Sequence, residues 1–187
     1  MNLNKAIQIV GYFLKKYNFK LNYTKLIKLL YLTDKEALRR WDTPVSYDNY
    51  CSMPNGPVLS GIYDLIMGKH ENEIEQLRWD EVFQRDGYDL VSFREGEIRT
   101  DELSERETDL SDEIDARFHD WTYSNLIRFT HNKKLFPEWK DPGDSSFPLS
   151  LHDVLKSIGR EEEEIKEILE EERIFESEAE YFSSCCK

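Results

Sequence analysis

The amino-acid sequence predicts a mainly α-helical fold: a single helical domain with a small antiparallel β-sheet of two or three strands packed on it, plus an acidic C-terminal helix. Three observations support this prediction. Apolar residues recur at helical spacing along most of the chain, an Asp-Gly dipeptide separates two strand-like runs, and an acidic stretch after Gly159 keeps an apolar stripe. With 187 residues, we expect one domain over residues 1–159 and an acidic amphipathic helix and tail over residues 160–187.

The N-terminal part of the chain predicts two helices. In residues 3–17 the apolar positions recur every three or four residues, as on one face of a helix. In residues 22–40 apolar side chains cover most of the circumference of the expected helix. A helix that is apolar nearly all round packs on several sides, so we expect the second helix to be central.

A proline-rich segment follows and predicts a change of structure. Pro44, Pro54 and Pro57 exclude one continuous helix. Tyr47–Met53 alternates and carries aromatic residues, which is typical of a short strand. Because proline suits the first helical turn, we expect a helix to begin at Pro57 and to end at Gly68.

The strand-like runs at residues 80–84 and 88–93 flank Asp86-Gly87, which is a strong two-residue turn signal. We expect a β-hairpin here. A lone hairpin is marginally stable, so this one must lie on the helices, where it can form one sheet with Tyr47–Met53.

The C-terminal half predicts further helices. Ser104 and Glu107 have the spacing of a capping box that opens a helix over residues 105–120, and Thr122 is the expected N-cap of the next helix, which runs to His131. Prolines and a glycine make residues 137–148 a loop. A short helix then covers residues 150–158, before the acidic segment.

Charge narrows the classes of partner. The chain has 25 basic and 38 acidic side chains, so its net charge is −13. This charge opposes binding to phosphate backbones, so we expect no nucleic-acid partner and favour a basic protein partner. The alternative is that the charge serves solubility alone.

The sequence also predicts a cytoplasmic location. Its three cysteines form no spaced disulfide framework, which is typical of a reducing compartment. The N-terminal stretch lacks the apolar core of a signal peptide, and no run of about eighteen apolar residues spans a membrane. We expect no membrane partner.

No pattern in the sequence indicates catalysis, a metal or a cofactor. The four histidines form no His-x-x-x-His or Cys-x-x-Cys pattern. His131 suits the end of a helix, where it interacts with free carbonyls. Because carboxylates are abundant, an acidic metal-dependent hydrolase site of unknown substrate stays open as the alternative function.

Residues 24–66, TKLIKLLYLTDKEALRRWDTPVSYDNYCSMPNGPVLSGIYDLI, resemble the Panacea domain, also called the SocA-like antitoxin domain. The shared pattern is a K-L-x-K-L-L-Y-L-x-D helix, an extended segment, a G-P-V motif before an Ile-Tyr pair, and a later L-x-x-x-T-H followed by a tryptophan. The matching residues are Lys25, Leu26, Lys28, Leu29, Leu30, Tyr31, Leu32, Asp34, Gly56, Pro57, Val58, Ile62, Tyr63, Leu126, Thr130, His131 and Trp139. Asn55 departs from the family, which often has an aromatic residue there.

The resemblance implies a mainly helical antitoxin, not an enzyme, that neutralises a toxin encoded beside it in a bacterial or phage toxin–antitoxin system. It implies direct protein–protein binding to the cognate toxin, and some relatives deliver the toxin to a protease, which here would be a cytoplasmic AAA+ protease. The toxin's identity does not carry over. We interpret the G-P-V motif as architecture rather than as a ligand contact.

The acidic segment lies beyond the resemblance. Residues 160–180 hold eleven Glu against three basic residues, yet apolar side chains keep roughly helical spacing. We expect this stripe to contact the partner, with packing on the chain's own domain as the alternative. Its candidate partner-binding residues are Ile165, Ile168, Leu169 and Phe175.

Overall fold

The computed structural model of the chain describes residues 1–93 and 98–185, with side chains described through Ile174. The fold is mainly helical (54%), as predicted, and the described residues form eight helices and two three-stranded antiparallel sheets. The helices are α1 (Leu3–Lys16), α2 (Tyr23–Trp41), α3 (Ser60–Met67), α4 (Glu73–Asp80), α5 (Glu105–Phe118), α6 (Tyr123–Thr130), α7 (Leu151–Ser157) and α8 (Glu162–Cys185). The strands are β1 (Lys20–Asn22), β2 (Tyr50–Met53), β3 (Gly56–Leu59), β4 (Phe83–Asp86), β5 (Asp89–Ser92) and β6 (Phe147–Leu149).

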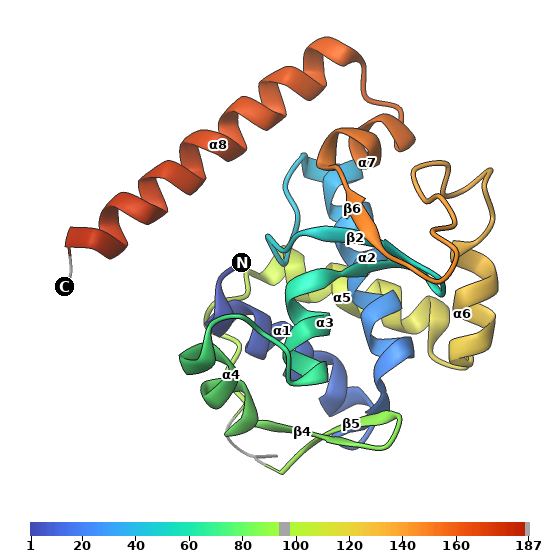
Figure 1. Cartoon of the computed structure of the whole chain (residues 1–187), viewed down its shortest axis with the longest axis vertical. Helices are drawn as coiled ribbons and strands as arrows, with labels where there is room; N and C mark the ends of the chain where they lie inside the picture. Colours follow the sequence, from blue (N-terminus) through green and yellow to red (C-terminus); the bar gives the residue numbers. More distant parts are fainter. Residues whose placement is uncertain (94–97, 186–187) are drawn as a thin grey trace.

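Helix α2 is the central element, as its pattern predicts. It contacts α1, α3, α5, α6, α7 and strand β3, and twelve of its residues are buried. The side chain of Asn22 accepts a hydrogen bond from Lys25 N at the start of the helix, and Asp42 ends it in a left-handed conformation with φ +62°. Figure 1 shows α2 in the middle of the body, behind the strands β2 and β6.

The prediction of one sheet is wrong, because the strands divide between two. In the first sheet the order is β1-β5-β4. Asp86 pairs with Asp89 across the predicted Asp-Gly turn, so the hairpin is confirmed. Its third strand, β1, pairs with β5 and carries no strand signal of its own in the sequence.

The second sheet has the order β3-β2-β6. Strand β2 pairs with the residues that immediately follow it, Met53 opposite Gly56, rather than with the distant hairpin. A local turn costs less loop-closure entropy than a distant pairing, which explains the difference. The other partner, β6, begins inside the segment expected to be a loop.

The helix expected from Pro57 begins only at Ser60, so that boundary is wrong. Gly56 has φ +99° and Pro57 pairs with Ser52, so both residues belong to a hairpin. The carboxylate of Asp48 accepts hydrogen bonds from Gly61 N (3.0 Å) and Ile62 N (2.8 Å), and thus caps α3 from outside its own sequence. The predicted end of the helix at Gly68 is confirmed.

Helix α4 is absent from the sequence prediction, which placed Asp80 at the start of a strand. Trp79 is the one buried residue of this helix, and its ring lies 4.6 Å from that of Phe83. A helix that buries one residue needs no apolar stripe, so the sequence gives no clear signal for it.

Helix α8 starts on the domain and then extends away from it (Figure 1). Gly159, with φ +90°, separates it from α7. Ile165 is fully buried in the main core, and Ile168 and Leu169 pack against that core. The division at residue 159 remains a prediction, although the first turns of α8 belong to the packed domain. Within the described residues, no helix is long and apolar enough to cross a membrane.

Candidate functional site

The motif residues of α2, β3 and α6 meet at one place in the core. The Lys28 side chain is buried, and its Nζ donates a hydrogen bond to Pro57 O at 2.6 Å. A Cβ atom added at Gly56 would lie 2.6 Å from Thr130 Oγ1 and 3.0 Å from Lys28 Nζ. Only glycine permits this close approach at φ +99°, so the G-P-V motif joins three elements of the fold.

Burial lowers the pKa of Lys28 to about 7. A buried ammonium is costly without a counter-ion, and the carbonyl of Pro57 supplies only a dipole. Lys28 therefore links α2 to β3 through a hydrogen bond that does not require a charge.

His131 lies beside this junction as the C-cap of α6. Its ring stacks on that of Trp139, with the centroids 4.1 Å apart and the planes inclined by 12°. Trp139 Nε1 in turn donates to Met53 O at 3.1 Å, which ties the end of β2 to the loop after α6. Burial, and then the charge of Lys28, lowers the pKa of His131.

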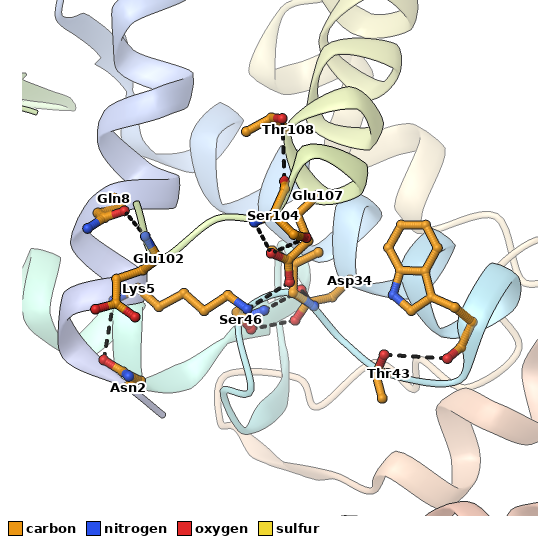
Figure 2. A network of polar contacts seen from close by, with 12 residues as sticks. Asn2, Lys5, Gln8, Asp34, Thr43, Ser46, Glu102, Ser104, Glu107 and Thr108 are labelled. Carbon is orange, nitrogen blue, oxygen red and sulfur yellow. Dashed lines mark hydrogen bonds and ion pairs between the residues drawn. The ribbon is translucent and has the colours of Figure 1, made fainter. Parts of the chain in front are cut away.

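Asp34 organises the loop between α2 and β2. Its carboxylate accepts hydrogen bonds from Val45 N (3.0 Å), Ser46 N (2.9 Å), Ser46 Oγ (2.5 Å) and Tyr50 OH (3.2 Å). Burial raises the pKa of Asp34 to about 6, although these hydrogen bonds oppose the rise. Figure 2 shows the Asp34–Ser46 contact beside the ion pair of Lys5 and Glu107, whose charged atoms are 2.7 Å apart.

Two further motif residues also act within the fold. Lys25 Nζ donates to His119 O at 2.5 Å, and Tyr31 OH donates to Glu138 Oε1 at 2.7 Å. Leu29 is fully buried. Most of the motif therefore holds α2 to its neighbours, and Lys28, Val58 and Tyr63 also line a surface hollow.

This hollow, which we name the motif pocket, has a volume of about 440 Å³. Tyr23 and Tyr63 form its aromatic side, and Ile27, Val58 and Met53 its apolar side. Asn55, Asp144 and Ser146 contribute polar groups, and Lys28 also lines it.

Two further hollows are linked to the motif pocket through shared lining residues. The sheet hollow, about 640 Å³, is lined by residues of β2 and β6 and shares Ser146 with the motif pocket. The helix hollow, about 200 Å³, lies under α8 at Ile168 and shares Leu151 and Glu172 with the sheet hollow. Together the three form what we name the sheet groove, which runs from Tyr63 to α8.

The candidate residues of α8 occupy different positions. Ile165 is fully buried, so no partner reaches it without movement of the helix. Ile168 lines the helix hollow, and Leu169 is partly buried. The side chain of Phe175 lies outside the described residues. Partner binding by this stripe remains a prediction.

The described side chains do not suggest a reaction. Among them, no three His, Cys, Asp or Glu residues gather as a metal site would require. Burial raises the pKa of the Cys51 thiol, which disfavours the reactive thiolate, and Cys51 Sγ lies 3.2 Å from Phe147 O.

Sequence reasoning missed the sheet groove. Its walls combine residues far apart in the chain, such as Tyr23, Ser146 and Glu172, and none of these belongs to a recognisable motif. The only local signal was Tyr63, a motif residue that is the fourth residue of α3.

The molecule is thus a small, mainly helical domain whose recognisable motif builds its core and borders a surface groove. The chain belongs to the antitoxin SocA-like, Panacea domain family, whose model matches residues 26–140. Members of this family are usually not enzymes. No curated protein and no solved structure matches the chain significantly.

Proposed function

We propose that this protein is the antitoxin of a toxin–antitoxin system and neutralises a protein toxin encoded beside it by direct binding. Membership of the antitoxin SocA-like family is the observation that carries the proposal. The net charge of −13 supports a basic partner, because opposite charges steer two proteins together and complement each other at the interface.

Co-expression tests this proposal. The adjacent reading frame is expressed alone and together with the antitoxin, and growth is measured. We expect arrest in the first case and rescue in the second, with both proteins recovered as one complex. A harmless neighbour, or rescue by a variant that no longer binds it, contradicts the proposal.

Helix α8 is proposed to contribute to the partner contact. Residues 162–174 carry seven Glu against Lys166 and Arg173, and the helix extends from the body. A chain that ends after Glu170 keeps the anchor residues Ile165, Ile168 and Leu169, so its fold should persist. We expect it to lose rescue while its thermal unfolding temperature stays within a few degrees. Full rescue by this shortened chain removes α8 from the interface.

Neutralisation by occlusion and by delivery to a cytoplasmic AAA+ protease differ in toxin lifetime. Delivery shortens the half-life of the toxin in cells that carry the antitoxin, whereas occlusion leaves the half-life unchanged or extends it. A pulse–chase measurement in cells with and without the protease separates these two routes.

A further inference from the structure

We propose that the sheet groove binds an extended segment of the basic toxin, with an aromatic or apolar side chain in the motif pocket and lysine or arginine side chains under α8. This inference rests on the proposed function and names the surface and the chemistry of the contact.

The groove brings together three hollows that share lining residues, as an extended segment would require. Ser146 joins the motif pocket to the sheet hollow, and Leu151 and Glu172 join that hollow to the space under α8. Strands β2 and β6 form its floor at the sheet hollow, where Cys51 and Phe147 are partly buried. A half-covered apolar sheet face favours burial against another chain.

The motif pocket is suited to an apolar anchor. Tyr23 and Tyr63 wall it, and the ring of the exposed Tyr88 stacks on Tyr23 with the centroids 6.3 Å apart. Aromatic side chains around a hollow are typical of the residues that dominate binding energy at protein interfaces. The aromatic and apolar side chains that line this end favour an uncharged anchor.

The opposite end of the groove has the opposite preference. Glu171 and Glu172 line the space under α8, together with Asp42 and the apolar side chains of Ile168 and Leu151. Asp42 is paired with Arg160 at 2.7 Å. Glu171 is exposed, and no hydrogen bond or ion pair joins its side chain to another described residue. A lysine or arginine of the partner can therefore pair with Glu171 next to an apolar surface that holds its aliphatic stem.

Titration of the antitoxin with the protein of the adjacent reading frame tests the inference, using the full-length chain throughout. Tyr63→Ala removes the aromatic wall and Glu171→Lys reverses the charge under α8. We expect each variant to weaken binding by about tenfold or more. Tyr123→Ala and Glu81→Lys are matched controls, since both residues are exposed and lie outside the groove, and each should change binding by no more than about threefold.

Hydrogen exchange in the complex supplies an independent readout. We expect added protection at residues 147–151 and none on α4. If the toxin binds and all four variants bind alike, or protection falls outside the groove, the inference is wrong while the proposed function stands. If the wild-type antitoxin does not bind, the proposed function itself fails. Should Tyr63→Ala fail to fold, the exposed Glu171→Lys and the exchange data still decide.

Discussion

The region of the family motif and helix α8 differ in how they use charge. In the motif region Lys28 and Asp34 are almost completely buried and bind backbone or side-chain groups of the same chain. Among the side chains of α8 that are described, the glutamates lie mostly on the surface and only Ile165 is fully buried. Polar residues thus hold the fold together in one region and face solvent in the other.

This difference separates the residues that maintain the family fold from the residues that would select the partner. A buried polar group needs its exact partner, so its replacement destabilises the fold. Replacing an exposed carboxylate costs little stability. The same replacement has a large effect on which partner surface binds there. We infer that the motif region maintains the fold, while α8 and the groove beside it determine the partner.

Replacing Gly56 by alanine should have the largest effect on stability. The new Cβ would lie 2.6 Å from Thr130 Oγ1, and that oxygen is held by hydrogen bonds to Leu126 O and Ile127 O. The left-handed backbone at φ +99° adds strain. We expect a loss of about 3 kcal/mol in the free energy of unfolding, measured by urea denaturation.

Gly143→Ala is the matched control, because Gly143 also has a positive φ (+63°) but nothing within 4 Å of an added Cβ. Its cost should be about 1 kcal/mol. The same reasoning applies to Gly56→Leu, which should lose stability before it loses recognition. A stable Gly56→Leu protein that no longer binds the toxin would place the motif in the interface instead.

Substitutions at two isoleucines of α8 test where this helix stops packing on the domain. Ile165→Ala should cost about 2 to 3 kcal/mol, because the side chain is fully buried and leaves a cavity. Ile174→Ala should cost less than about 0.5 kcal/mol, because half of that side chain is exposed. Equal costs at the two positions in thermal or chemical unfolding would show that Ile165 and Ile174 are packed to the same extent, and would contradict this boundary.

The sequence predicted the helices that have a strong apolar period, and it failed where a contact from elsewhere decides the structure. The central position of α2 followed from its apolar circumference. The start of α3 could not be predicted from its own residues, because the carboxylate that caps it belongs to Asp48, outside the helix. Strand β6 was hidden by Pro148, which pairs with Cys51 at the edge of the sheet, where a missing N–H is tolerated.

The candidate site was predictable only through the resemblance. The pattern of the sequence identified the motif residues, but only the structure shows that most of them are buried. The sheet groove joins Tyr23, Ser146 and Glu172, which no local pattern connects. A groove is a property of how elements pack, so a single sequence carries little signal for it.

The buried Lys28 predicts a dependence of stability on pH with a definite sign. Its pKa is about 7 in the folded protein and near 10.5 in the unfolded chain, so the unfolded state binds more protons between these values. Stability should therefore rise with pH, by about 2 kcal/mol from pH 7 to pH 9. The raised pKa of the Cys51 thiol acts in the opposite direction above about pH 8.5, so the measured gain is expected to be slightly smaller.

Lys28→Met isolates this contribution, because methionine fills a similar volume and does not titrate. We expect its urea midpoint to stay flat over the same pH range, whereas the midpoint of the wild-type protein rises. The variant loses the hydrogen bond to Pro57 O but also the cost of a buried ammonium, so its stability at pH 7 should lie within about 1.5 kcal/mol of wild type. A variant that keeps the rise would mean that other groups cause the pH dependence. A wild-type midpoint that does not rise between pH 7 and pH 9 would mean that Lys28 stays charged in the core. In that case the motif region would use charge as α8 does.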